Sequence, residues 1–549
     1  MKKPLLLSLA AAALIVTNLS AETTMYERFE AMEREMNQLK QEIATLKAQK
    51  ESTQDEEAED DGEPGTVASD DAQSADSVAS DDAGEDTEVV ASADEAQEEE
   101  SDEDEEYIPS TDDRLFDIEE SIAELNRNTS GSHLKFQVDY RFAIENMSYE
   151  MANGDKAEND AFMTNRLWID MGYKATNNLS FIGQLAYNKA FGQRSGASNP
   201  ATASLEGFDW IANESAYDDK IRVRSAYFLW QDQEFFGLDI PWTFSIGRRP
   251  STNGALVNLR DDDHASSPIG HAINVEFDGL SSQFTLNKEY KTSVKLCLGR
   301  GMSNAAPKFT STPYAEVSTE NTNIDLAGLI FTPYEDRQYK ISSMYYYASN
   351  LIDVKDPDAN PLTIDYRDGF DTVGGLHTGV AYVSVKGIGD GWSNFLDYTT
   401  VFASFAVSKT DPKEGQSMLG STQSETGTSF WVGTQFPSLI SDYGKWGVEY
   451  NHGSKYWRSM TYGEDTNIGS KLAARGDAYE VYFTEYLVDD ILSMQLRYTY
   501  IDYEYSGSNG FFGSTTGTPI TMDQAVSYGM GGSVVDNAQD IRLYIRYKY

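Results

Sequence analysis

The chain ends in DIRLYIRYKY (residues 540–549), where apolar or aromatic side chains alternate with polar ones up to the last residue. One phase of this alternation consists of Ile541, Leu543, Ile545, Tyr547 and Tyr549. A period of two is that of a β-strand with one apolar and one polar face. We therefore predict a terminal amphipathic strand that closes on an aromatic residue.

The same period begins at LKFQVDYRFAI (residues 134–144) and returns along the rest of the chain. Two alternating stretches, 167–173 and 179–187, are separated by a short turn containing Asn177 and Asn178, which predicts a hairpin. Further strands are predicted at 221–230, 242–249, 272–280, 293–299, 323–332, 338–348, 375–386, 396–408, 428–436, 445–451, 478–486 and 492–503. These segments predict an all-β fold with about 16 antiparallel strands, in a range of about 14 to 18.

Two architectures fit many short strands, a large soluble β-sandwich and a transmembrane β-barrel. Short turns such as 334–337 alternate with long polar segments such as 195–219, as in bacterial outer-membrane barrels. A closing strand with a terminal aromatic also resembles the signal read by the barrel assembly machinery. The signal residues are Leu543, Ile545, Tyr547 and Tyr549. We predict an antiparallel barrel at residues 133–549 in contact with outer-membrane lipid.

The chain begins like a secreted protein. Lys2 and Lys3 precede an apolar run at residues 5–16, and small residues follow at Ser20 and Ala21. The run is too short for a membrane span of about 20 residues. We predict a signal peptide at residues 1–21, which implies a Gram-negative outer-membrane location for the barrel.

Residues 22–50 predict a coiled-coil helix. Apolar residues alternate at spacings of four and three: Met25, Phe29, Met32, Met36, Leu39, Ile43 and Leu46. The charges flanking this seam are opposite in each g-to-e pair of a parallel arrangement: Arg28/Glu33, Glu35/Lys40 and Glu42/Lys47. A single amphipathic helix is the alternative. We favour a parallel homo-oligomer, with a trimer preferred over a dimer, and a periplasmic N-terminal region.

The net charge of −46 is concentrated in one segment. Residues 51–106 contain 26 Asp and Glu, no Lys or Arg and no aromatic residue. Such a composition cannot bury a core, so we predict a disordered acidic linker at residues 51–110 and a short helix at 111–128. The acidic balance argues against nucleic acid as a partner, because nucleic-acid binding needs basic patches.

Basic residues recur on the polar phase of the predicted strands. We predict a pore-lining ladder of Arg141, Arg166, Arg222, Arg224, Arg249, Arg497, Arg542 and Arg546, facing acidic loops such as residues 261–263. The alternative is that the polar wall of a barrel carries charge only because lipid excludes it.

No catalytic or metal-binding motif stands out. The five histidines form no zinc spacing, and the single Cys297 rules out an intramolecular disulfide. Residues 356–365 begin like a calcium loop, but Pro361 and Arg367 stand where Gly and Glu belong. We expect no enzyme activity, no metal and no cofactor. A hydrolase with a Ser–His pair is the main enzymatic alternative.

Three phrases resemble one known family: SIGRRPSTNG (residues 245–254), EYNHGSKYW (449–457) and KLAARGDAYEVY (471–482). The family is an uncharacterised group of bacterial outer-membrane porins, known mainly as a domain of unknown function. The likeness covers roughly residues 115–549 and omits the acidic segment. It implies a porin-like barrel and supplies no substrate.

Two functions follow as expectations. The first is a porin for passive diffusion of ions or small hydrophilic solutes, because a barrel of this size has room for a water-filled lumen narrowed by loops. The second is a structural anchor with a plugged barrel, in which the helix and the acidic segment tether the outer membrane to another envelope layer.

Overall fold

The computed structural model describes residues 134–192, 216, 220–305, 309, 311–316, 323–355, 369–461, 464–507 and 517–549. The predicted signal peptide, coiled coil, acidic linker, short helix and calcium-like loop lie outside the described residues. In the described part of the chain, no helix is long and apolar enough to cross a membrane.

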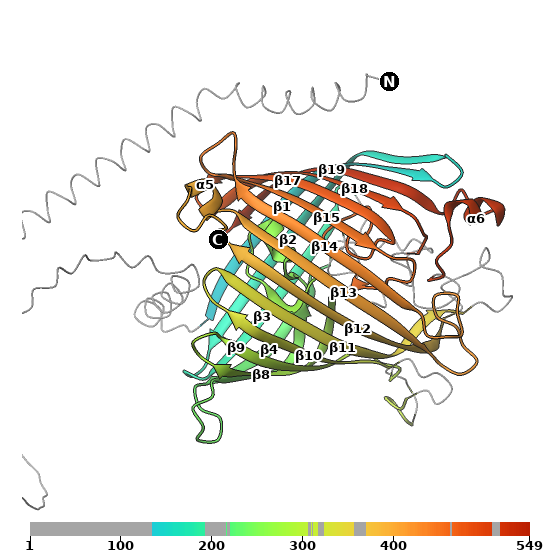
Figure 1. Cartoon of the computed structure of the whole chain (residues 1–549). Coiled ribbons are helices and arrows are strands. Elements are labelled where there is room, and N and C mark those ends of the chain that lie inside the picture. Colours follow the sequence, from blue (N-terminus) through green and yellow to red (C-terminus); the bar gives the residue numbers. More distant parts are fainter. Residues whose placement is uncertain are drawn as a thin grey trace, which may run out of the picture. The chain divides into compact units, whose positions relative to one another are not determined.

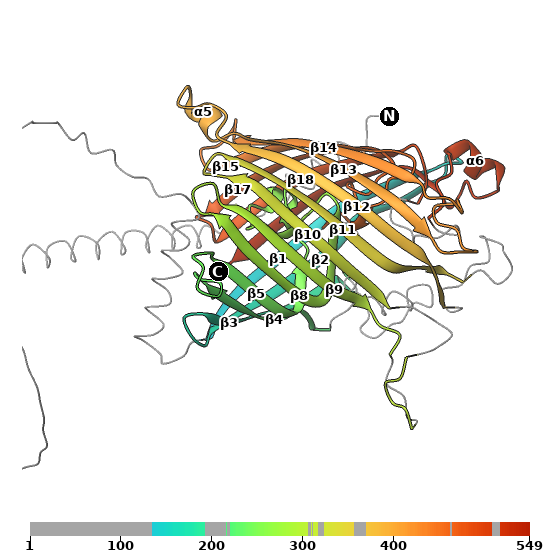
Figure 2. The same ribbon diagram turned by 60° about the horizontal axis from the view of Figure 1, so that its bottom comes forward.

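Sixteen antiparallel strands form a closed barrel (Figure 1). They are β1 (Leu134–Met151), β2 (Lys156–Lys174), β3 (Leu179–Ala190), β4 (Arg222–Asp232), β5 (Trp242–Ser251), β8 (Ile273–Asn287), β9 (Thr292–Met302), β10 (Ile324–Glu335), β11 (Tyr339–Val354), β12 (Phe370–Lys386), β13 (Thr400–Pro412), β14 (Thr426–Pro437), β15 (Gly444–Gly453), β17 (Gly476–Val488), β18 (Leu492–Tyr503) and β19 (Val535–Lys548). The predicted strand count is confirmed, and Figure 2 shows the strands tilted across the barrel wall, as closure requires.

The first and last strands close the barrel. β1 pairs with β19 from Asp139↔Lys548 to Met151↔Val535. The closure continues to the last residue, because the backbone N–H of Tyr549 donates to the carbonyl of Val138 (2.9 Å) and the N–H of Val138 donates back (2.7 Å). The described strands therefore leave no open sheet edge at this seam, where unpaired backbone groups in lipid would be costly.

The alternation read from the sequence separates two surfaces. Outward side chains such as Phe136, Leu296 and Phe405 are 62%, 43% and 54% exposed. Inward side chains such as Asp139 and Glu145 are 2% and 1% exposed. An apolar outside and a polar inside reverse the order of a soluble protein, and such an exterior is stable only against lipid.

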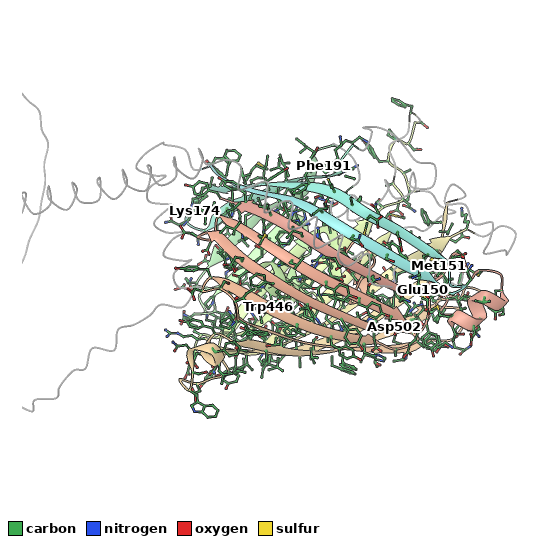
Figure 3. The ribbon with its side chains drawn as sticks, turned by 90° about the horizontal axis from the view of Figure 1, so that it is seen from above. Glu150, Met151, Lys174, Phe191, Trp446 and Asp502 are labelled. Carbon is green, nitrogen blue, oxygen red and sulfur yellow. The ribbon has the colours of Figure 1, made fainter. Side chains whose placement is uncertain are left out.

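The connections differ between the two ends of the barrel. Tight turns such as 175–178 and 336–338 lie at the end that holds Tyr549, and Lys174 and Trp446 mark this end in Figure 3. The long connections lie at the opposite end, marked by Met151 and Asp502. Short helices lie in connections at both ends, α5 (Asn394–Asp397) on the turn side and α6 (Met522–Ser527) on the loop side (Figure 1).

Several strands, such as β1, β2 and β8, are longer than predicted, and one predicted start lies in a helix. The sequence predicted a strand from residue 396, but β13 begins at Thr400. The backbone N–H of Leu396 donates to the Ser393 hydroxyl (3.3 Å), an N-cap that starts α5. Local capping therefore overrides the apolar pattern at this position.

Two connections from the long-loop end fold back into the barrel. The 252–272 loop joins β5 to β8 and contains β6 (Gly254–Ala255), the 3₁₀ helix η3 (Val257–Asp261) and β7 (Ser266–Ile269). The 454–475 loop joins β15 to β17 and contains β16 (Met460–Thr461), which pairs in parallel with the start of β8. The water-filled lumen expected from the sequence is therefore partly occupied by the chain itself.

Candidate functional site: the barrel lumen

The tip of the 252–272 loop reaches the turn end of the barrel. Asp263 pairs with Arg546 (2.9 Å) and Lys548 (2.8 Å) of the last strand. Arg546 also pairs with Asp139 of β1 (2.6 Å). On the other side of the tip, Asp262 pairs with Lys445 (2.7 Å). The acidic tip is thus held by basic residues near the turn end.

The 454–475 loop is held by a second cluster. Asp465 accepts two hydrogen bonds from the guanidinium of Arg141 (2.6 Å each) and pairs with Arg542 (3.3 Å). Burial alone would raise the pKa of Asp465, but Arg141 and Arg542 outweigh it and hold that pKa well below its ordinary value. Asp465 is therefore a carboxylate at neutral pH.

A third cluster joins both loops to the wall. Lys471 lies 2.6 Å from the carboxylates of both Glu449 and Glu480. Arg260 of the 252–272 loop pairs with the same Glu480 (3.2 Å). All four side chains are at most 4% exposed. Removing one partner of such a buried pair costs about 3–5 kcal/mol, because a charge is left without compensation.

A fourth cluster surrounds an aromatic ring. The guanidinium carbons of Arg166 and Arg224 lie 3.6 and 4.2 Å from the ring centre of Trp168. Glu276 pairs with Arg224 (3.2 Å) and with Arg248 (2.7 Å). Cation–π and ionic contacts together fix this part of the lumen wall.

The structure places the predicted ladder as follows. Arg141, Arg166, Arg224, Arg497, Arg542 and Arg546 are at most 8% exposed and lie in polar contacts, whereas Arg222 and Arg249 are half-buried. The six buried arginines bind carboxylates, hydroxyls or loop carbonyls, so they hold the inner loops and the wall in place instead of lining open water.

Of the acidic half of these clusters, only the loop at residues 261–263 was predicted from the sequence, and its Asp263 pairs with Arg546. Asp139 and Glu145 share the inward phase of β1 with Arg141, so the alternation carried that signal. The loop residues Asp465 and Lys471 lie in no regular pattern. Arg141 and Asp465 are 324 positions apart, and no local pattern predicts their contact.

The other half of the lumen is apolar. Trp431 and Trp457 are fully buried in a cluster with Tyr346, Phe402 and Leu472. Trp457 donates from its indole to the carbonyl of Leu472 (2.8 Å), which ties two ends of the 454–475 loop together. This loop is packed like a protein core against β11–β14.

His271 raises the question of catalysis. Its Nδ1 lies 2.8 Å from the Ser404 hydroxyl and its Nε2 lies 2.9 Å from the Ser429 hydroxyl. Burial lowers the pKa of His271 to about 3, so the ring is neutral at pH 7. The imidazole is fully buried beside Trp431 and Trp457, and the Ser404 and Ser429 side chains are buried with it.

One strip of the lumen wall remains partly exposed. Its residues face inward from adjacent strands β2–β5, β8 and β9: Asp170, Gln184, Tyr227, Arg249, Gln283 and Lys295. The inner loops pack mainly on the opposite wall. In the residues that the structure describes, no group of three His, Cys, Asp or Glu is arranged to hold a metal ion.

A closed 16-strand barrel with an apolar exterior and a charged interior defines a transmembrane β-barrel with a porin-like fold. The chain belongs to the family described as "Protein of unknown function (DUF3373)", which matches residues 156–549. This confirms the family resemblance read from the sequence.

Several solved structures are similar in fold at low identity. OmpT, an outer membrane protein of Vibrio cholerae, shares 12% identity, with a TM-score of 0.39 over 76% of this chain and 97% of that chain. An anion-selective porin from Comamonas acidovorans shares 9% (TM-score 0.41, 76% and 100%). The outer membrane channel DcaP of Acinetobacter baumannii shares 12% (TM-score 0.39, 77% and 99%). No curated protein matches the chain.

Proposed function

We propose that the chain is an outer-membrane porin through which ions or small hydrophilic solutes diffuse passively. The partly exposed polar strip carries the proposal, because its side chains are less buried than the lumenal arginines that hold the inner loops. The path runs between this strip and the 252–272 loop. Solutes would be selected by size at this narrowing and by the charges of Asp170, Arg249 and Lys295.

The buried ion pairs set the character of the path. Because most lumenal arginines are neutralised by carboxylates, the path is expected to have a modest field of mixed sign. The two inner loops take up volume, so the conductance is expected to lie well below that of an open barrel of the same strand number. No catalytic step is needed for this function.

Orientation and assembly are part of the proposal. Long loops of bacterial barrels face outward and short turns face the periplasm. The start of β1 and Tyr549 lie at the turn end, so the N-terminal region would be periplasmic. There the predicted coiled coil would join the chains into a trimer, after insertion by the barrel assembly machinery.

A plugged, non-conducting anchor is the second candidate. The complete burial of Trp457 and the near-complete burial of Arg458 and Lys471 favour it, because a loop packed to this degree resembles a permanent plug. A plugged anchor requires that no continuous path for solutes run along the polar strip from one end of the barrel to the other.

Liposome swelling tests the porin proposal directly. Proteoliposomes are diluted into isotonic solutions of sugars of increasing size, and their light scattering is followed. We expect fast swelling with the smallest sugars and a sharp decline with size, since the loops narrow the lumen. The absence of swelling with all sugars and with small ions would contradict a diffusion pore.

A further inference from the structure

A pocket lies between the 252–272 loop and the wall formed by β5, β8, β9, β10 and β11. Its empty volume is about 540 Å³, part of which is open space. The wall side is mainly apolar, with Leu326, Ile330 and Met344. Ile273 and Phe277 of β8 and Pro268 of the 252–272 loop also line the pocket.

The polar end of the pocket consists of Arg249 and Ser281. Arg249 donates to the Ser281 hydroxyl (2.9 Å), and its guanidinium carbon lies 4.7 Å from the ring centre of Tyr227. In the described part of the chain, no carboxylate lies within ion-pairing distance of Arg249, whereas the adjacent Arg248 pairs with Glu276. Within the described residues, Arg249 is thus a half-buried cation without a carboxylate partner.

A second cation strengthens the positive character of this end. Lys295 interacts electrostatically with Arg249 and with Cys297, and Cys297 lines the pocket. A half-buried cation at the edge of an apolar cavity is costly unless an anion compensates it. A guanidinium matches a carboxylate in shape and forms short, strong hydrogen bonds with it.

We propose that this pocket binds a linear alkyl carboxylate, with its carboxylate on Arg249 and its tail among Leu326, Ile330 and Met344. A dianionic or strongly hydrated ligand would not fit the apolar lining, and a neutral or cationic amphiphile would leave Arg249 uncompensated. The proposal does not depend on whether the barrel conducts.

The only cysteine of the chain makes occupancy measurable. Cys297 lines the pocket, so a bound ligand should shield its thiol. The full chain is reconstituted in nanodiscs and treated with methyl methanethiosulfonate, and the modification rate is measured by intact mass. Octanoate is compared with octanol, which has the same tail without charge, and with octylamine, which has the opposite charge.

We expect octanoate to slow modification at concentrations about tenfold or more below those at which octanol or octylamine act. In Arg249→Gln the potency of octanoate should fall by about tenfold or more, because a charge-assisted hydrogen bond is lost. The matched control is Arg300→Gln, which removes an arginine of β9 that is 47% exposed and pairs with Asp325 outside the pocket. In Arg300→Gln, the potency of octanoate should stay at the wild-type value.

Three results would overturn the proposal. The first is equal protection by all three amphiphiles, and the second is equal potency of octanoate in wild type and Arg249→Gln. The third is no protection by octanoate. If Arg249→Gln loses the heat-modifiable folded form, the wild-type comparison of octanoate with octylamine decides. If the thiol is unreactive, calorimetry with the same ligands and proteins replaces labelling. Conductance enters none of these readouts, so failure here leaves the porin proposal standing, and the reverse also holds.

Discussion

At the residue scale, Glu480 is a residue of the wall that contacts both inner loops. It receives Lys471 from one loop, Arg260 from the other and the Thr499 hydroxyl from β18 (2.9 Å). The gain from such a buried network over an apolar core is small, but the loss of one member is expensive. The network therefore acts mainly to fix one position for each loop.

Neutralising Glu480 should loosen both loops. In Glu480→Gln, Arg260 and Lys471 lose a charged partner, so we expect a loss of about 3–5 kcal/mol in unfolding free energy and faster proteolysis within residues 252–272. Glu335→Gln is the control, because Glu335 pairs with Lys340 at a partly exposed site (24% and 38%) and should cost less than about 1 kcal/mol. Equal losses in the two variants, in urea unfolding and limited proteolysis, would contradict the role given to Glu480.

The polar strip is testable by single cysteines in a Cys297→Ser background. Gln283 faces the lumen and Ser282 faces outward on the same strand. A charged, water-soluble methanethiosulfonate should react with Gln283→Cys and lower the conductance, because the added group enters the path. The same reagent should leave the conductance of Ser282→Cys unchanged, because this side chain lies against lipid. A current that does not respond to Gln283→Cys labelling would place the path elsewhere.

At the element scale, the period-two alternation predicted every strand of the barrel because each strand has one face in lipid and one in the lumen. The inner loops could not be predicted in this way, since their fold depends on contacts with distant strands. The sequence did contain one signal for the positions of these two loops. The phrases at 245–254, 449–457 and 471–482 lie where strands pass into or out of the two loops. The family resemblance therefore coincided with the lumen-filling parts of the chain.

The last strand closes the barrel, so its end should be required for insertion. Deleting residues 547–549 removes the pairs Tyr140↔Tyr547 and Asp139↔Lys548 and the backbone bonds to Val138. Each unpaired backbone group in lipid costs several kcal/mol. We expect loss of the heat-modifiable, membrane-integrated form on gels. Normal amounts of that form after the deletion would show that the terminal residues are dispensable.

The predicted coiled coil at residues 22–50 remains a prediction, with a direct test. Replacing Met36 and Ile43 by Asp puts charges in the seam at an expected cost of several kcal/mol. We expect the oligomer to weaken in native mass spectrometry while each barrel stays folded. As a control, Gln41→Asp adds a charge outside the seam and should leave the oligomer intact. An unchanged oligomer in the double variant would refute the seam.

At the scale of the whole molecule, closure and strand number followed from the sequence, but the filling of the lumen did not. The direction of a long loop, outward or inward, depends on apolar and ionic contacts between residues far apart in the sequence, such as Arg141 and Asp465. The predicted basic ladder was therefore placed on the lumenal phase, while acidic partners other than the 261–263 loop, such as Asp139 and Asp465, were missed.

The central claim is that the barrel is a pore narrowed by its own loops, and single-channel recording in planar bilayers tests it most directly. Ala255 and Ile269 are paired at the base of the 252–272 loop, so a short Gly–Ser linker can replace residues 256–268. We predict small, steady current steps for the wild type and clearly larger steps for the variant. A silent wild type with a conducting variant would show a plugged anchor, and silence in both or equal steps in both would contradict the account.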